Sequence, residues 1–111
     1  MIEARIIIST INDQNAGEAI ITQLVSEGLI ACGNLLPSAT SIYRWQGKIE
    51  REAEILLILK TQAERLMELQ ERYHALHPYE VPEFVVLTPD GISEPYLQWL
   101  LDETEPAKAE R

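Results

Sequence analysis

The chain has 111 residues, of which 46% are hydrophobic and 24% charged, as expected for one folded domain with a single core. Its formal net charge of -9 argues against nucleic acid and anionic membranes as partners, because no basic patch exists to contact phosphates. The lone cysteine, Cys32, excludes an internal disulfide, and the acidic N-terminus with its short apolar run resembles neither a signal peptide nor a membrane span. We therefore expect a cytoplasmic protein.

The N-terminal third predicts a strand followed by a helix. Residues 5–11, RIIISTI, form a β-branched run typical of a strand, and residues 12–29 carry apolar side chains at helical spacing. Asn12 or Asp13 is placed to cap the start of this helix, and Gly28 to end it in a left-handed conformation.

Residues 30–61 predict a long β-hairpin. Gln46 and Gly47 form a two-residue turn, which pairs Trp45 with Lys48 and the next aromatic residue, Tyr43, with a glutamate. Each arm runs for about 15 residues, whereas strands usually have about 5 to 6. The hairpin therefore extends beyond any core that this chain can build, and Pro37 is expected to interrupt its first arm with a bend or bulge.

The C-terminal half predicts a helix over residues 62–76, a strand over 83–88 and a short helix over 93–103 that is capped by Ser93. Pro78 ends the first of these helices. The order β-α-β-β-α-β with an extra helix is that of an α+β, ferredoxin-like fold with an antiparallel sheet. We expect one domain over residues 1–104 and a polar tail over residues 105–111.

The predicted strands carry consecutive large apolar residues on both faces, notably in RIIISTI, EILLILK and EFVVLT. The chain supplies one layer of helices, and one further short helix is too small to cover the second face. Large exposed apolar patches are rare on monomers. We therefore predict a homo-oligomer.

The stretch HALHPYEVPE, residues 74–83, contains the chain's two histidines. His77 is a candidate ligand for a transition metal such as copper, with Cys32 or a nearby carboxylate as a further ligand. The alternative is that His77 belongs to a helix stop and that Cys32 is a buried, inert thiol. No catalytic motif is present, so we do not expect an enzyme. The glutamates at 50, 52 and 54 are expected to form a solvated strand face.

Aromatic residues at the hairpin tip, Tyr43 and Trp45, are costly to expose, as is Trp99 in the last helix. They are expected to anchor an interface between subunits or to line a ligand cleft between them.

Several motifs together resemble the CutA family of divalent-ion tolerance proteins. They are ACGNLLPSATSIYRWQGKIEREAEILLILKT over residues 31–61 and HPYEVPE over residues 77–83. The resemblance implies a homotrimer whose long hairpins join adjacent subunits, and an architecture similar to the PII signalling proteins, which bind effectors between subunits. It also implies copper binding by His77. Two further ligand positions used by some bacterial members correspond here to Ser9 and Leu76.

The leading hypothesis is a non-enzymatic homotrimer that binds divalent cations, copper foremost, and needs no cofactor to fold. The alternative is a PII-like effector-binding trimer. Its intersubunit cleft would be lined by Tyr43, Trp45, Lys60, Tyr79 and Trp99.

Overall fold

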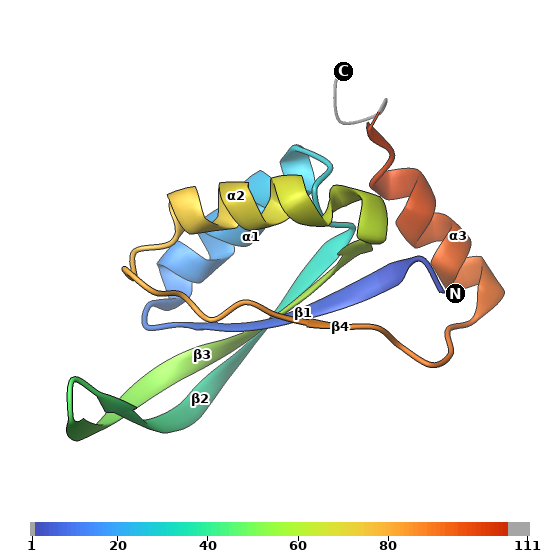
Figure 1. Ribbon diagram of the computed structural model, residues 1–111. Helices are drawn as coiled ribbons and strands as arrows, with labels where there is room; N and C mark the ends of the chain where they lie inside the picture. The colour runs from blue at the N-terminus through green and yellow to red at the C-terminus, as the bar shows by residue number, and fades with distance from the viewer. Residues whose placement is uncertain (1, 107–111) are drawn as a thin grey trace.

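The computed structural model describes residues 2–106, which form an α+β fold of four strands and three α-helices (Figure 1). A 3-10 turn, Ala63–Arg65, leads from the third strand into the second helix. The predicted β-α-β-β-α-β order with an extra C-terminal helix is confirmed. The elements are β1 Ala4–Ile11, α1 Gln14–Ser26, β2 Cys32–Trp45, β3 Lys48–Gln62, α2 Leu66–Leu76, β4 Val85–Leu87 and α3 Glu94–Glu103.

The four strands form one sheet in the order β2-β3-β1-β4, with antiparallel neighbours throughout. Helices α1 and α2 lie over one face of this sheet, and α3 lies at one end of it, near the N-terminus (Figure 1). The packing of Leu100 of α3 against Ala4 and Ala31 fixes this position. The opposite face of the sheet has no helix over it among residues 2–106.

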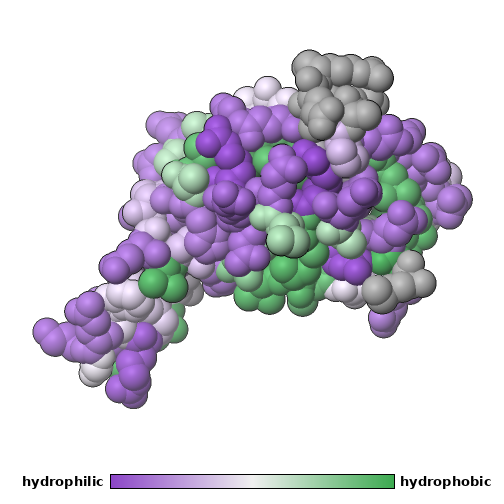
Figure 2. Space-filling view, turned by 45° about the horizontal axis from the view of Figure 1, so that its top comes forward, coloured by the Kyte–Doolittle hydropathy of each residue, from purple (hydrophilic) through white to green (hydrophobic). Residues whose placement is uncertain are grey.

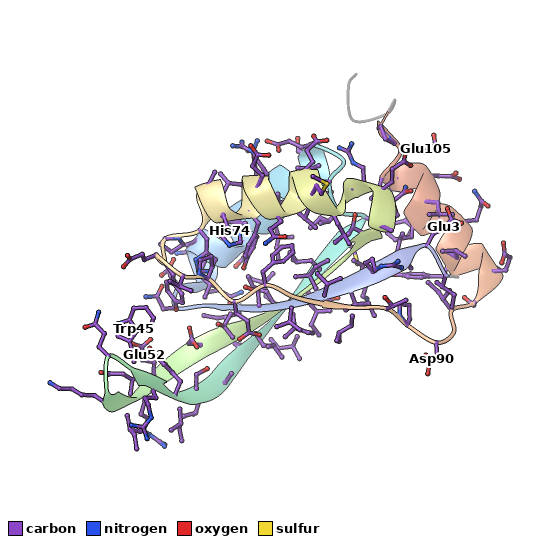
Figure 3. All side chains as sticks on the ribbon, viewed as in Figure 1. Glu3, Trp45, Glu52, His74, Asp90 and Glu105 are labelled. Atoms are coloured by element: carbon purple, nitrogen blue, oxygen red, sulfur yellow. The ribbon has the colours of Figure 1, made fainter. Side chains whose placement is uncertain are left out.

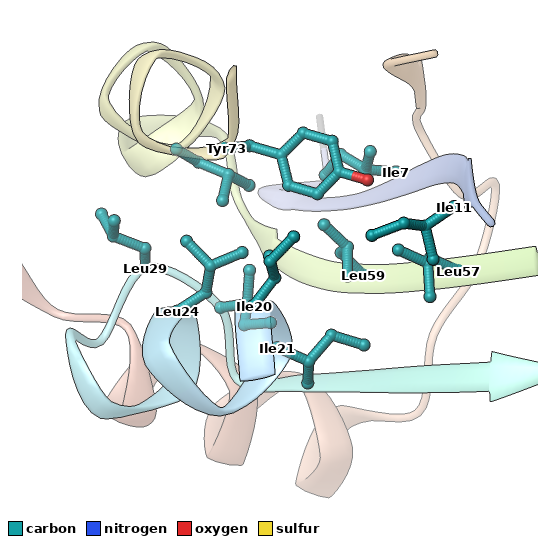
Figure 4. Close-up of a cluster of buried hydrophobic side chains, with 11 residues drawn as sticks. Ile7, Ile11, Ile20, Ile21, Leu24, Leu29, Leu57, Leu59 and Tyr73 are labelled. Atoms are coloured by element: carbon teal, nitrogen blue, oxygen red, sulfur yellow. The ribbon is translucent and has the colours of Figure 1, made fainter. Parts of the chain in front are cut away.

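The main core lies between the helical layer and the sheet (Figure 4). Burial of each Leu or Ile side chain in this core stabilises the fold by roughly 1.5–3 kcal/mol. Helix α1 contributes the face that the 3.6-residue period predicts, while Asp13 caps the helix by accepting a hydrogen bond from the Ala16 N–H at 2.8 Å. The fully buried side chains of this core include Ile7, Ile11, Leu24, Leu29, Ile30, Leu57, Leu59, Leu69 and Tyr73.

The long hairpin has the predicted turn and register. Gln46 and Gly47 both have positive φ, at 49° and 81°, and Trp45 pairs with Lys48. Strands of 14 and 15 residues carry the hairpin well past the end of β1, which stops opposite Ile55. The predicted interruption near Pro37 is a register shift between Leu36 and Ala39.

Two element boundaries and one helix cap differ from the prediction. Helix α2 starts at Leu66, because residues 63–65 wind as a 3-10 turn. Strand β4 is only Val85–Leu87, since it pairs with β1 only through Ile6–Ile8. Ser93 occupies the N-cap of α3 but makes no capping hydrogen bond through its side chain.

The sequence also led to predictions for Gly28, for the C-terminal tail and for membrane spans. Gly28 adopts the predicted left-handed conformation, with φ of 71°. Of the tail expected over residues 105–111, residues 107–111 lie outside the described part of the chain, so the domain limit at 104 stays a prediction. Within residues 2–106, none of the helices combines the length and the apolar character needed to cross a bilayer.

The uncovered face of the sheet is apolar, as the sequence predicts. In Figure 2 hydrophobic side chains gather along the lower edge of the molecule, below the hydrophilic helical layer and beside the base of the hairpin. Pairing across the strands assigns these side chains to one face. They are Ile6, Ile8, Leu36, Leu56, Ile58, Val85 and Leu87. Leu36, Val85 and Leu87 are each more than 40% exposed.

Candidate functional site

His77 lies directly after α2 and connects this segment to β1. Its backbone is extended because the following residue is a proline, which disfavours helical geometry at the position before it. The ring is buried. Nδ1 accepts a hydrogen bond from the Tyr79 N–H at 3.0 Å, so Nε2 carries the proton and donates to the Thr10 carbonyl at 2.8 Å. Burial is the main cause of a lowered pKa at His77.

Both nitrogens of His77 are therefore occupied within the chain. A metal ion at either nitrogen displaces one of two hydrogen bonds that hold the connection after α2 against the sheet. The geometry agrees with the structural interpretation of HPYEVPE, and the role of His77 as a metal ligand stays a prediction.

Tyr79 reaches from this connection to β3. Its hydroxyl donates a hydrogen bond to Glu54 Oε2 at 2.5 Å, and its ring lies edge-on to His77 with centroids 4.6 Å apart. Burial and then the Glu54 carboxylate raise the pKa of Tyr79. Glu54 itself is only 6% exposed. The prediction of a solvated glutamate face is thus wrong at this position, because the segment after α2 covers it.

A cleft of about 750 Å³ opens between the outer half of the hairpin and residues 79–83, and we call it the outer cleft. Figure 3 shows Trp45 and Glu52 on the side of the hairpin that faces the connection between α2 and β4. The aromatic and acidic side chains that line the outer cleft are Tyr43, Trp45, Tyr79, Glu50, Glu52, Glu54, Glu80 and Glu83.

Two side chains of the outer cleft, Tyr43 and Glu83, have raised pKa values. A hydrogen bond to Glu52 is the main cause of a raised pKa at Tyr43. Partial burial, followed by repulsion from Glu54, raises the pKa of Glu83. Repulsion from neighbouring carboxylates adds to both shifts, after the hydrogen bond at Tyr43 and burial at Glu83.

The remaining predicted site residues lie near α3, at the other end of the sheet. Cys32 Sγ is 3.7 Å from the Tyr96 hydroxyl, and Lys60 Nζ lies 5.8 Å from the centre of the same ring. Trp99 packs beside Tyr96 with ring centroids 5.4 Å apart. The structure therefore brings Tyr43, Trp45 and Tyr79 together, but places Lys60 and Trp99 in a different group.

His77 and Cys32 do not meet within one chain. Cys32 pairs with Lys60, which lies opposite Ile6 of β1, whereas His77 contacts Thr10 at the far end of that strand. Four residues of strand separate the two places by roughly 13 Å. Nowhere in residues 2–106 do three or more His, Cys, Asp or Glu side chains form a group able to hold a metal ion.

Comparison with known proteins decides the family. Residues 5–103 match the family model described as CutA1 divalent ion tolerance protein. This chain belongs to the CutA family.

Similar CutA proteins come from distant organisms. The divalent-cation tolerance protein CutA of Thermus thermophilus is 41% identical over 89% of this chain and 96% of its own. That of Pyrococcus horikoshii is 41% identical over 90% and 97%. The crystal structure of CutA from Xylella fastidiosa superposes with a TM-score of 0.90 at 41% identity, covering 93% of this chain and 99% of that one.

Ser9, at a position where the CutA resemblance placed a metal ligand in some bacterial members, has a structural role here. It is fully buried, lies 2.5 Å from the Tyr73 hydroxyl and donates to the Glu83 carbonyl at 2.6 Å. Burial raises the pKa of Tyr73 to about 12, so the phenol stays protonated at neutral pH. The pair joins β1, α2 and the connection that leads to β4.

Sequence reasoning missed Glu80, Glu83 and Tyr96 as cleft or cluster residues, and it misjudged Glu54. One signal was available for Glu54. It occupies the boundary between the acidic and the apolar halves of β3. Local alternation alone does not show that a distant segment returns to cover this residue.

Proposed function

We propose that this chain acts as a non-catalytic homotrimer that binds divalent cations and contributes to divalent-cation tolerance. The family provides the general role, since the similar proteins from Thermus thermophilus and Pyrococcus horikoshii are named for divalent-cation tolerance. The observation that carries cation binding is the carboxylate of Glu54, buried in an acidic cleft and bonded to no cationic side chain of residues 2–106.

The apolar face of the sheet supports self-association. Seven large aliphatic side chains occupy a face that no element of residues 2–106 covers. Three of them, Leu36, Val85 and Leu87, are more than 40% exposed, and full burial of such a side chain contributes about 1.5–3 kcal/mol. The outer hairpin is a two-stranded ribbon, which is marginal alone in water. Packing against other copies stabilises both features, and the CutA resemblance supplies the number three.

The carboxylates of the outer cleft suit hard divalent cations, which bind through one or two carboxylates and keep several waters. The net charge of -9 concentrates such cations around the protein. Copper at His77, with Cys32 from another subunit, is the second arrangement to test. It requires the imidazole to release Thr10 or Tyr79.

Light scattering of the purified protein tests the trimer. We expect a mass close to three times the 12.6 kDa of one chain, maintained on dilution. Ile58→Glu places a charge on the apolar face and is expected to dissociate the assembly. Met67→Glu, at a side chain of α2 that is 88% exposed, is the matched control and leaves the mass unchanged. A stable monomer of the parent protein would refute the proposal.

Calorimetric titration with Cu(II), Zn(II), Mn(II) and Mg(II) tests cation binding. We expect saturable binding by the trimer, weakened about tenfold in Glu54→Gln, because a carboxylate ligand becomes a neutral amide. Loss of copper binding in His77→Ala, with normal binding by Glu54→Gln, supports the His77 arrangement instead. Absence of saturable binding of all four ions contradicts the proposed function.

A further inference from the structure

Two exposed aromatic groups lie at opposite ends of the sheet. Tyr43 and Trp45 belong to the tip of the hairpin, beyond the end of β1, whereas Tyr96 and Trp99 belong to α3 at the other end (Figure 1). Each of these four side chains is between 38% and 42% exposed. Aromatic side chains are enriched at contacts between subunits, because their large apolar surface is costly to leave in water. Both groups are therefore candidate contact surfaces.

A small pocket lies beside α3, and we call it the α3 pocket. Its volume is about 180 Å³, below the roughly 300–1,000 Å³ of small-molecule sites. Ile6, Ile92 and Leu100 provide apolar walls, and Tyr96 lines the pocket as well. Side chains that anchor protein interfaces are typically tryptophan or tyrosine held in such a pocket. The α3 pocket therefore suits one large side chain better than a whole ligand.

The α3 pocket and the outer cleft beside the hairpin tip carry opposite charge. The charged residues that line the α3 pocket are Arg5 and Lys60, and Lys60 forms no ion pair within residues 2–106. The charged residues that line the outer cleft are all glutamates, with Glu50 and Glu52 nearest the tip. Opposite charges on two surfaces steer them together and fix their relative orientation. The two ends of the chain are thus complementary to each other.

We propose that Trp45 of one copy of this chain enters the α3 pocket of the next copy. Lys60 of that pocket then faces Glu50 and Glu52 of the inserted hairpin. The end of the next copy that carries α3 covers the outer cleft, so the cleft is complete only in the assembly. This inference rests on the proposed homotrimer and names the surfaces through which its subunits join.

The proposed contact runs head to tail, because it joins different surfaces at opposite ends of the sheet. An open series of copies leaves one tip and one pocket unfilled, and a closed ring fills them all. Ile6 belongs both to the α3 pocket and to the uncovered apolar face of the sheet. The contact at the tip is therefore continuous with the face that other copies cover.

Two variants that each remove one side of the contact test the proposal by light scattering. Trp45→Glu removes the side chain that enters the pocket. Gly91→Phe fills the pocket from its own chain, since a Cβ at Gly91 meets no atom within 4 Å. We expect each variant to associate at least about thirtyfold more weakly than the parent protein, as for an aromatic hot spot. Ile49→Glu, on the opposite face of the same hairpin, is the matched control and leaves association unchanged.

A mixture of the two variants, at a concentration at which each alone is monomeric, tests the head-to-tail order. One intact contact remains possible, between Trp45 of the Gly91→Phe chain and the pocket of the Trp45→Glu chain. We expect a heterodimer with about twice the mass of one 12.6 kDa chain. A mixture that stays monomeric overturns the proposal, and so do variants that associate as strongly as the parent. Circular dichroism of each variant confirms that the fold is retained.

Acrylamide quenching provides a second test that leaves the contact intact. Trp99→Phe makes Trp45 the only tryptophan of the chain. In this protein Trp45 should be quenched several-fold less than in the variant that also carries Gly91→Phe, because the filled pocket no longer admits it. Equal quenching in a trimeric protein overturns the contact alone, whereas a monomeric parent overturns both the contact and the homotrimer.

Discussion

The two halves of β3 behave as different structures although they form one continuous strand. In the inner half Leu57 and Leu59 are fully buried, and β1 and β2 flank the strand on both sides. In the outer half Ile49 is 72% exposed and only β2 pairs with the strand. The division falls where β1 ends, opposite Ile55. The end of β1 therefore divides the hairpin into an inner part that stabilises the domain and an outer part that is available to contact ligands or other subunits.

The largest expected effect tests this division by removing equivalent aliphatic side chains from the two halves. Leu57→Ala leaves a cavity in the buried core and should lower the free energy of unfolding by about 2–5 kcal/mol. Ile49→Ala should change it by less than about 0.5 kcal/mol. Urea denaturation at one fixed protein concentration provides the measurement.

Similar losses in the two variants would contradict the division. A large loss for Ile49→Ala that grows smaller at higher protein concentration would instead place Ile49 in a subunit interface.

The second prediction concerns the boundary between the halves, where Tyr79 bonds to Glu54. Tyr79→Phe removes the only hydrogen-bond donor that residues 2–106 offer this buried carboxylate, and should lower the free energy of unfolding by about 1–3 kcal/mol. Tyr43→Phe, the control at an exposed tyrosine of the same cleft, should have a much smaller effect. Thermal denaturation of both variants provides the comparison.

Adding Glu54→Gln to Tyr79→Phe should recover part of the loss, since a neutral amide is less costly to bury without a partner than a carboxylate. Additive losses in the double variant would show that the two side chains stabilise the fold independently.

The smallest expected effect depends on pH and arises at His77. Burial lowers its pKa, and the nearby charge of His74 does so further, while the backbone bond to Thr10 and the charge of Glu54 oppose them. The unfolded chain then binds a proton at higher pH than the folded chain. The stability provided by neutral His77 is complete above the ordinary pKa of 6.5 and is lost as pH falls below it.

The free energy of unfolding should therefore decrease between about pH 7.5 and 5.5, and decrease less in His77→Gln. His74→Gln, at the exposed histidine, should retain most of the dependence of the parent protein. An unchanged pH dependence in His77→Gln would show that other groups cause the loss. The acidic side chains are common to all three proteins, so their titration cancels in the comparison.

The backbone architecture was predictable because its signals are local. The RIIISTI run, the helical period before Gly28 and the Gln46–Gly47 turn each act over a few residues, and the structure confirms all three. The apolar second face was equally visible, since consecutive large residues in a strand occupy both sides of it.

The arrangement of the site was less predictable, because it depends on contacts between distant segments. The sequence alone does not show that Tyr79 reaches Glu54, nor that Lys60 and Trp99 lie at the opposite end of the sheet from Trp45. The pairing of His77 with Cys32 was chosen by chemical type, and distance along β1 separates the two residues.

The irregularity after Pro37 determines what the outer cleft contains. Between Leu36 and Ala39 strand β2 advances three residues while β3 advances two, so Ser38, with φ of 69°, is one residue in excess. That single insertion exchanges the two sides of β2 from there to the tip. An uninterrupted ladder would turn Tyr43 and Trp45 away from the glutamates and bring Arg44 to them as a built-in counterion. One unpaired residue at the base of the arm thus keeps the acidic surface open to cations from outside.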